Sequence, residues 1–236
     1  MFPIGDDPHP GGTARLVTLT LIVANVLAFF LELSRPSPEA LQSFIQSWGV
    51  VPREYSAGTD LAPRIPLPFW STLVTSMFLH GGWMHLGGNM LYLWIFGDNL
   101  EKVMGHARFL AFYLVCGIAA GLAHIVFNAR SNVPTVGASG AISGILGGYM
   151  LMFPRNRVRV LTQRGVMAVP AFVMLGIWIL IQLVSSVGSV ARTEQTEGGG
   201  VAFLAHVGGF VAGLVLVKLF AAGRGVPGVR GRALRY

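Results

Sequence analysis

The stretch "TVGASGAISGILGG", residues 135–148, places Ser139 among small residues at the start of an apolar run. Small residues are common where membrane helices touch, so the stretch fits a packing face. A serine beside a general base also fits a nucleophile. Which role applies depends on what the rest of the chain brings to this end of the run.

The composition indicates an integral membrane protein. Of the 236 residues, 53% are hydrophobic and 11% are charged, whereas soluble domains carry roughly 25% charged residues. The mean hydropathy is +0.62. The single cysteine, Cys116, lies within an apolar run, which excludes an internal disulfide framework and favours a packing role.

Six apolar runs are candidate membrane spans, because about 20 apolar residues cross roughly 30 Å of hydrocarbon. They cover residues 16–33, 83–100, 107–127, 137–153, 166–187 and 201–220. The segment before the first run lacks the features of a signal peptide, so we expect this run to be retained. The sequence therefore predicts an all-α integral membrane protein with a six-transmembrane-helix bundle. The bundle occupies residues 16–220, between tails at 1–15 and 221–236.

Basic residues predict the orientation of this bundle. If the amino terminus is cytoplasmic, only five of the 17 Lys and Arg residues lie on the outer side. These five are Arg35, Arg53, Arg64, Arg130 and Arg192. Positive residues favour the cytoplasmic side, so we expect a multi-pass protein of the plasma membrane with both termini in the cytoplasm. The same asymmetry explains the net charge of +7 without nucleic acid as a partner.

Five polar side chains are candidates for chemistry, and all five fall in the outer half of the membrane under this topology. They are His80, His85, Asn89, Ser139 and His206. Polar groups at membrane depth are energetically expensive, so each becomes a functional hypothesis. The run that begins at 137 has 17 residues, or about 25 Å as a helix, which is shorter than the hydrocarbon core. We therefore expect Ser139 at a helix amino terminus in a water-filled pocket that opens to the outer side.

Two faces of small residues predict how these side chains meet. Both repeat every four positions, and they consist of Gly140, Gly144 and Gly148 in the fourth run and Ala205, Gly209 and Gly213 in the sixth. Such faces let the backbones of two membrane helices approach closely. Close packing here would bring the Ser139 hydroxyl to the His206 ring, and these groups are a nucleophile and a general base.

The second run supplies candidate donors for an oxyanion. His85 and Asn89 are four residues apart and share a helical face. Together with the backbone N–H of Ser139, they can stabilise negative charge that develops on a substrate carbonyl. Glu32, at the edge of the first run, is the only acidic residue in the outer half of any run. A Ser–His dyad is therefore a better prediction than a triad with a carboxylate.

Structural interpretations compete with these roles. His206 and Asn89 can each serve as interhelical hydrogen-bond partners. His80 and His85 are five residues apart with no glutamate between them, so the HExxH zinc pattern is absent. We therefore expect neither a metal nor a cofactor. The motif "GASGA" also differs at Ala141 from the GxSxG of soluble hydrolases.

The outer connections and the fifth run complete the prediction. Residues 34–67 form a long connection with a short interfacial helix, and residues 188–200 form a polar, glycine-ended loop that could move. Both are expected on the outer side. Trp178 and Gln182 share a face of the fifth run. We interpret that face first as a packing surface and second as a substrate gate.

Four motifs resemble those of the rhomboid intramembrane serine proteases. They are "GASG" at 137–140, H-x4-H-x3-N at 80–89, "AHVGG" at 205–209 and "GDNLEKVMG" at 97–105. The last contains Gly97, Glu101 and Gly105 and matches the family pattern GxxxExxxG. The resemblance covers roughly residues 70–220, and its three site motifs occur in the family's order. It is typical of the minimal six-span bacterial form.

The resemblance implies a role for each matching residue. Ser139 would be the nucleophile and His206 its base, with His85 and Asn89 on the oxyanion. His80, Gly137 and Ala138 would lie beside the site, and Glu101 would be structural. The two outer connections would correspond to the family's lateral loop and cap.

The resemblance also implies an activity. The family cleaves transmembrane helices of other proteins near their outer ends, within the lipid bilayer. Many members carry an aromatic residue four positions after the nucleophile, stacked on the histidine, whereas this chain has Ser143. Two alternatives are a non-catalytic rhomboid-like protein that binds membrane clients and a transporter with a broken fourth helix. The intact Ser–His pair argues against the first, and the lack of an internal repeat argues against the second.

Overall fold

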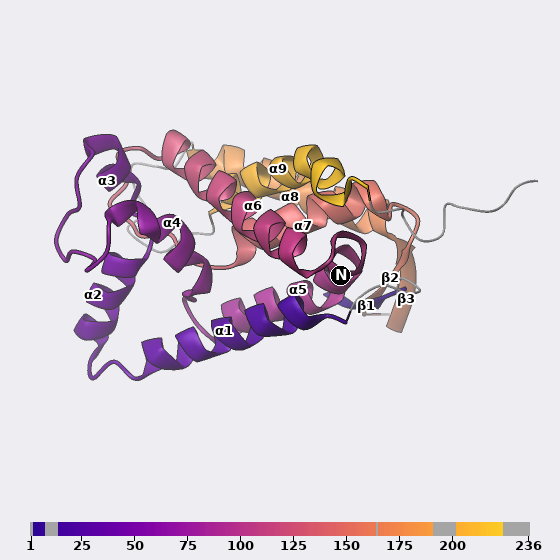
Figure 1. Ribbon diagram of the computed structural model, residues 1–236, viewed down its shortest axis with the longest axis horizontal. Coiled ribbons are helices and arrows are strands. Elements are labelled where there is room, and N and C mark those ends of the chain that lie inside the picture. The colour runs from indigo at the N-terminus through magenta and orange to yellow at the C-terminus, as the bar shows by residue number, and fades with distance from the viewer. Residues whose placement is uncertain (1, 8–13, 164, 191–201, 224–236) are drawn as a thin grey trace, which may run out of the picture.

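Long helices that run along one axis dominate the computed structural model (Figure 1), which describes residues 2–7, 14–163, 165–190 and 202–223. Within these residues, the six helices of 14 residues or more are α1 (Leu16–Leu33), α5 (Trp83–Met104), α6 (His106–Phe127), α7 (Ser139–Met152), α8 (Ala171–Val190) and α9 (Phe203–Ala221). The prediction of a mostly helical protein is thus confirmed.

Short elements occupy the two ends of the helical layer. One end holds α2 (Pro38–Trp48), α3 (Pro52–Ala57), η1 (Phe69–Ser71), α4 (Thr72–Thr75) and η2 (Ser76–Phe78), and the other holds a small sheet (Figure 1). Helix α2 begins where the Ser37 hydroxyl accepts a hydrogen bond from the Ala40 N–H, with Pro38 in its first turn. The α2–α4 end is called the site end below, because Ser139 lies on that side.

Among the described residues, three helices are long and apolar enough to cross a membrane, namely α1, α6 and α9. Helix α5 is more polar, since its final turns carry Asp98, Glu101 and Lys102. Helix α7 has 14 residues, and every residue from Gly140 to Tyr149 is buried. A helix that is surrounded by protein need not meet the length of a lipid-exposed span. The chain is a membrane protein, and the six-span count stays a prediction.

The three-stranded sheet corrects the prediction of an all-α chain. Strand β1 (Phe2–Asp6) pairs antiparallel with β2 (Arg157–Thr162), which pairs antiparallel with β3 (Gly165–Pro170). The predicted fifth run began at 166, but residues 166–170 belong to β3 and the helix begins at Ala171. In β2, Val158 and Val160 are fully buried while Arg157 and Arg159 face outward. This alternation is the period of a half-buried strand.

Asp6 anchors β1 beneath the helices. Its carboxylate accepts hydrogen bonds from the Tyr149 hydroxyl and from Asn99 Nδ2, the latter at 2.7 Å. The pKa of Asp6 is raised to about 6, because burial and, less strongly, the neighbouring Asp98 carboxylate outweigh the two hydrogen bonds, which lower it. The segment predicted as a tail, residues 1–15, therefore contributes a strand that is tied to α5 and α7.

Helices α7 and α9 meet at backbone distance. A Cβ added to Gly209 would overlap the carbonyl oxygen of Gly140, and one added to Gly213 would overlap that of Gly144. On α7, Gly147 plays the reciprocal part, because its Cβ would overlap the carbonyl oxygen of Phe210. Each glycine removes the side chain that would hold the two helices apart.

The glycine face of α7 has a second partner that the sequence did not indicate. We predicted that Gly140 and Gly144 open toward the sixth run, but their Cβ positions point at Ala120 and Cys116 of α6. Their carbonyl oxygens face α9 instead. Helix α7 lies between α6 and α9. The lack of a Cβ on Gly140 and Gly144 therefore lets α6 approach, while their carbonyl oxygens face α9.

Asp6 makes the docking of β1 depend on pH. Its native pKa of about 6 lies above the ordinary value of 3.8, so docking is strongest below pH 3.8 and weakens as the pH rises through 6. Lowering the pH from 7.5 to 5 should strengthen docking by about 1.4 kcal/mol, which lowers the equilibrium constant for opening of β1 roughly tenfold. Amide hydrogen exchange of β1, corrected for intrinsic rates, measures this change. Asp6→Asn should abolish the pH dependence. Equal protection of β1 in the wild type at both pH values would contradict a role of Asp6 in pH-dependent docking.

Two glycine variants test the α7–α9 contact. Gly213→Ala places a methyl group on a backbone carbonyl that cannot rotate away, so it should lower the free energy of unfolding by about 3 kcal/mol. Gly176→Ala makes the same change in α8, where nothing lies within 4 Å of the added Cβ. It should be neutral or stabilising by up to about 1 kcal/mol. Unfolding in mixed micelles compares the two, and equal effects would rule out a tight seam.

Candidate active site

Ser139 and His206 form a hydrogen-bonded pair at the site end. Ser139 is the first residue of α7, and His206 lies in the first turn of α9. The distance between Ser139 Oγ and His206 Nε2 is 2.8 Å. The His206 side chain is buried, with a residue exposure of 8%. The two residues that the sequence predicted to meet are therefore in contact.

The α7–α9 seam sets this distance. Gly209 lies one turn along α9 from the histidine, and a Cβ added there would overlap the carbonyl oxygen of Gly140, the residue next to the serine. At the helix start, the first intrahelical bond runs from the Ile142 N–H to the Ala138 carbonyl. The N–H groups of the preceding residues, including Ser139, have no carbonyl within the helix, as is usual for a first turn. These donors and the helix dipole favour negative charge beside Ser139.

A third side chain, Gln182 of α8, contacts the same imidazole. The distance between its Oε1 and His206 Nδ1 is 2.7 Å. An amide oxygen only accepts, so Nδ1 carries the proton, and Nε2 of the neutral ring is left to accept from the Ser139 hydroxyl. Trp178, one turn earlier on α8, faces the ring at a centroid distance of 6.0 Å and an interplanar angle of 33°. The sequence placed Trp178 and Gln182 on one face but did not link them to His206.

His85 and Asn89 face the loop before Ser139. A Cβ added to Gly137 would lie 2.7 Å from His85 Nε2 and 3.6 Å from Asn89 Nδ2. His85 Nδ1 accepts a hydrogen bond from the Gly81 N–H at 3.3 Å, so in the neutral ring Nε2 is the donor. Asn89 Nδ2 is buried and has no hydrogen-bond partner among the described residues. Both nitrogens are thus donors aimed toward the serine loop.

The serine loop is held in place by its backbone. Gly137 has φ of +124°, a conformation that favours glycine, and its N–H donates to the Ser76 carbonyl at 2.8 Å. Two residues earlier, Thr135 pairs with Val50 through both backbone hydrogen bonds. Ala138, predicted beside the site, is fully buried at the start of α7. The long connection after α1 therefore supports the loop that presents the serine.

His80 lies next to this group without reaching Ser139. Its backbone N–H donates to both carboxylate oxygens of Glu32, at 3.0 and 3.3 Å. Its ring packs edge-on against His85 at a centroid distance of 5.1 Å. No group of three or more His, Cys, Asp or Glu side chains suited to a metal occurs in the part of the chain that the structure describes. The two hydrogen bonds from the His80 N–H to the Glu32 carboxylate fix the turn that precedes α5.

Glu101 lies at the opposite end of the bundle. Its fully buried carboxylate accepts the backbone N–H groups of Val17 and Thr18, at 2.7 and 2.8 Å, and the Thr18 hydroxyl at 2.6 Å. His106 Nδ1 lies 2.6 Å from its Oε1. These contacts tie the first turn of α1 to the junction of α5 and α6, which is a structural arrangement.

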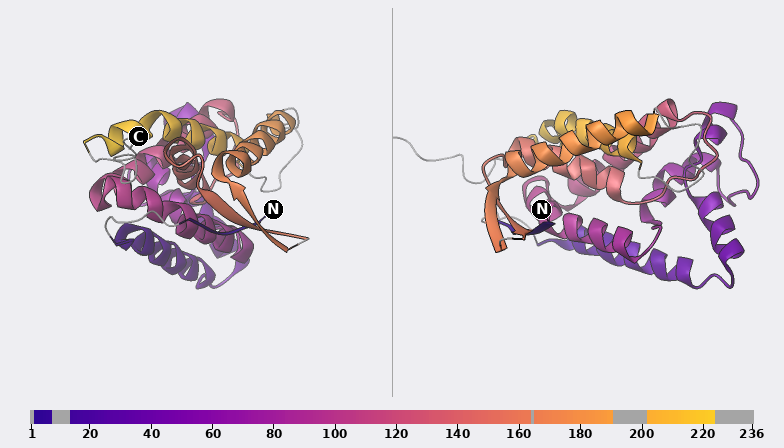
Figure 2. Two further views of the ribbon diagram at one scale, coloured as in Figure 1. Left: turned by 90° about the vertical axis from the view of Figure 1, so that its right-hand side faces the viewer. Right: turned by 180° about the vertical axis from the view of Figure 1, so that it is seen from behind.

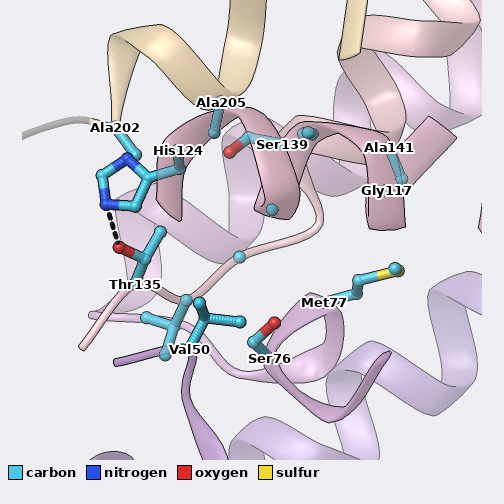
Figure 3. Close-up of a pocket in the computed structure, with 15 residues that line it drawn as sticks. Val50, Ser76, Met77, Gly117, His124, Thr135, Ser139, Ala141, Ala202 and Ala205 are labelled. Atoms are coloured by element: carbon cyan, nitrogen blue, oxygen red, sulfur yellow. Dashed lines mark hydrogen bonds between the residues drawn. The ribbon is translucent and has the colours of Figure 1, made fainter. Parts of the chain in front are cut away.

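A small pocket opens beside the serine (Figure 3). It has a volume of about 30 Å³, and Ser139, Ser76, His124 and Thr135 contribute its polar lining. That volume has room for one or two water molecules. His124 Nε2 lies 2.8 Å from Thr135 Oγ1. His124 was not among the predicted site residues, although it also is a polar residue near the outer end of an apolar run.

Part of the predicted site environment lies outside the described residues. The loop at 188–200 falls there from residue 191 onward, as does most of the tail at 221–236.

The class that this fold and site define is the rhomboid family, and comparison with known proteins supports the same assignment. Residues 68–223 match the Rhomboid domain, so the chain belongs to the rhomboid family. The chain is similar to the rhomboid protease GluP of Bacillus subtilis, with 32% identity over 158 residues, which is 67% of this chain and 27% of that protein. It is similar to mitochondrial rhomboid protein 1 of Saccharomyces cerevisiae, with 30% identity over 61% of this chain and 40% of that protein.

A shorter match, 40% identical over 83 residues, joins the chain to the putative rhomboid protease YdcA of Bacillus subtilis. It covers 35% of this chain and 41% of that protein. The chain therefore spans less than half the length of each of these three relatives.

Proposed function

We propose that the chain is an intramembrane serine endopeptidase with Ser139 as nucleophile and His206 as general base. The observation that carries the proposal is the 2.8 Å hydrogen bond between Ser139 Oγ and His206 Nε2. That distance allows the proton to pass from the hydroxyl to the ring as the oxygen attacks. Relatives named as rhomboid proteases support the assignment.

The first half of the reaction forms an acyl-enzyme. Ser139 Oγ attacks the scissile carbonyl carbon, and its proton moves to His206 Nε2. The tetrahedral intermediate then collapses, the C–N bond breaks, and the leaving amine takes the proton from the imidazolium. The ring returns to the neutral form in which it began.

Three donors would stabilise the oxyanion of that intermediate. They are the backbone N–H of Ser139, the Asn89 amide and the His85 Nε2–H. The negatively charged substrate oxygen would accept a hydrogen bond from Asn89 Nδ2, which is buried and has no other partner among the described residues. Pre-positioned donors of this kind act strongly because the surrounding protein and lipid screen charge weakly.

Hydrolysis of the acyl-enzyme needs water, which the hydrocarbon excludes. The pocket beside Ser139 has polar groups from Ser76, His124 and Thr135 in its lining and has room for one or two water molecules. His206 would take a proton from such a water as the water attacks the ester carbon. Ser139 would then leave with that proton.

The proposed topology has six spans, both termini in the cytoplasm and the active site opening to the outer face of the plasma membrane. Arg15, Lys102, Arg157 and Arg159 lie at the end opposite Ser139, as the positive-inside rule requires of a cytoplasmic end. Substrates would be transmembrane helices of other proteins, cleaved near their outer ends. Helical carbonyls are hydrogen-bonded within the helix, so the substrate must unwind before Ser139 can attack.

Ser139→Ala tests the nucleophile. Without the hydroxyl, cleavage of a reporter transmembrane substrate in liposomes should fall to background, and a fluorophosphonate probe should label the wild type alone. Ser143→Ala removes a hydroxyl one turn later, which donates to the Ser139 carbonyl, and should retain labelling. Equal cleavage by wild type and Ser139→Ala would exclude the dyad. Binding of helix-destabilised reporters without cleavage by the wild type would favour a client-binding protein.

Asn89→Ala tests the oxyanion donors. Loss of one donor should lower kcat about 100-fold with little change in KM, because the donor acts on charge that appears only in the transition state. Asn25→Ala makes the same change at a buried asparagine of α1 that donates to the Leu21 carbonyl. It should leave kcat within about threefold, and steady-state cleavage in detergent compares the two. Equal losses in both variants would assign the effect to packing.

A further inference from the structure

The His206 ring must be held in one tautomer and one orientation, and the α7–α9 pair alone does not supply a group that does so. A neutral imidazole has two tautomers, and only the one protonated on Nδ1 can accept the serine proton at Nε2. The residue one turn after Ser139 is Ser143, which is buried and whose hydroxyl donates to the Ser139 carbonyl at 2.6 Å. That hydroxyl is engaged within α7 and leaves the ring unrestrained from this side.

Helix α8 provides the restraint. Gln182 Oε1 lies 2.7 Å from Nδ1, and the Gln182 residue is 9% exposed. Trp178 covers the ring from the same helix face. By contrast, Leu180, Ile181 and Leu183 are exposed on α8, which lies at the edge of the bundle (orange in Figure 2). A polar side chain on a helix of this kind is stable only where it turns inward and finds a partner.

We propose that Gln182 is a positioning residue for the Ser139–His206 pair, which it aligns by fixing the Nδ1-protonated tautomer and the direction of the ring. The inference rests on the proposed function of that pair. The amide oxygen takes the place that a carboxylate holds in Ser–His–Asp triads, and it also accepts from the imidazolium that forms after proton transfer.

A neutral acceptor suits this position in the membrane. An unpaired carboxylate buried beside hydrocarbon would have to lose its hydration before the imidazolium forms, which is costly in the resting state. Glu32, the acidic residue predicted in the outer half of the membrane, already accepts a hydrogen bond from the His80 N–H. An amide oxygen orients the imidazole as the carboxylate of a triad does, without placing a permanent charge at membrane depth.

The competing interpretation is that Gln182 only holds α8 against α9. Two variants of similar size separate the roles. Gln182→Met keeps the length of the side chain but removes the acceptor, and Gln182→Glu keeps an acceptor at the same place. Leu183→Met, next along the helix and 45% exposed, is the matched control. Each is assayed as full-length protein in detergent with a transmembrane reporter substrate, beside the wild type and Ser139→Ala.

Positioning predicts a specific pattern. Gln182→Met should lower kcat about 10- to 100-fold with KM within twofold, because Gln182 touches the base and not the substrate. Gln182→Glu should recover at least a third of the wild-type kcat, and Leu183→Met should match the wild type. Nitrogen-15 spectra of histidine-labelled protein should show His206 protonated on Nδ1 in the wild type. That signal should be lost or split in Gln182→Met.

The outcomes separate the two proposals. A wild-type kcat in Gln182→Met, or a wild-type His206 protonated on Nε2, would overturn the role of Gln182 while leaving Ser139 as nucleophile. An equal loss in the Met and Glu variants with an unchanged tautomer would assign Gln182 to packing. If Gln182→Met does not fold, the wild-type spectrum and the kcat of Gln182→Glu decide. Cleavage that survives Ser139→Ala would instead overturn the proposed function itself.

Discussion

The backbone contact between α7 and α9 is the constraint on which the site depends. Lipid offers no hydrophobic force that pushes one membrane helix against another, so contact relies on close packing. Gly209 and Gly213 pack against the carbonyl oxygens of Gly140 and Gly144. Ser139 and His206 lie where this seam reaches the site end of the bundle. A hydrogen bond of 2.8 Å is lost within about 1 Å of separation. A single added methyl group in the seam would exceed that tolerance.

The polar groups divide between the two ends of the bundle according to what they hold. At one end, Glu101 and Asp6 accept hydrogen bonds from backbone N–H groups, two hydroxyls and an amide of other elements, which locks α1 and β1 to the ends of α5 and α7. At the other end, His85 Nε2 and Asn89 Nδ2 are donors aimed at the serine loop. The anchoring carboxylates hold several hydrogen bonds, whereas Asn89 Nδ2 at the site end has no hydrogen-bond partner among the described residues. A core that consists largely of apolar side chains lies between the two sets.

Much of this arrangement was predictable from the sequence, and the failures have physical causes. The start of the helix at Ser139 and its meeting with His206 followed from the glycine spacing and from the cost of polar groups in lipid. The sheet was missed because β2 is six residues long and β3 continues into the apolar run of α8, so length and hydropathy alone could not separate strand from helix. The periodicity of α8 placed Gln182 on a face, but it could not say which helix that face meets.

Two supports of different kind therefore act on the two members of the pair. Ser139 is fixed by α7, a buried helix whose neighbours lie on every side. The ring of His206 is fixed from α8, which is exposed along much of its length. The distance between the two residues depends on the glycine seam, whereas the tautomer and direction of the ring depend on where α8 lies. A shift of α8 would thus leave serine and histidine adjacent while removing the acceptor at Nδ1, so the contact between the two residues and the position of the proton on the ring are separable properties of this site.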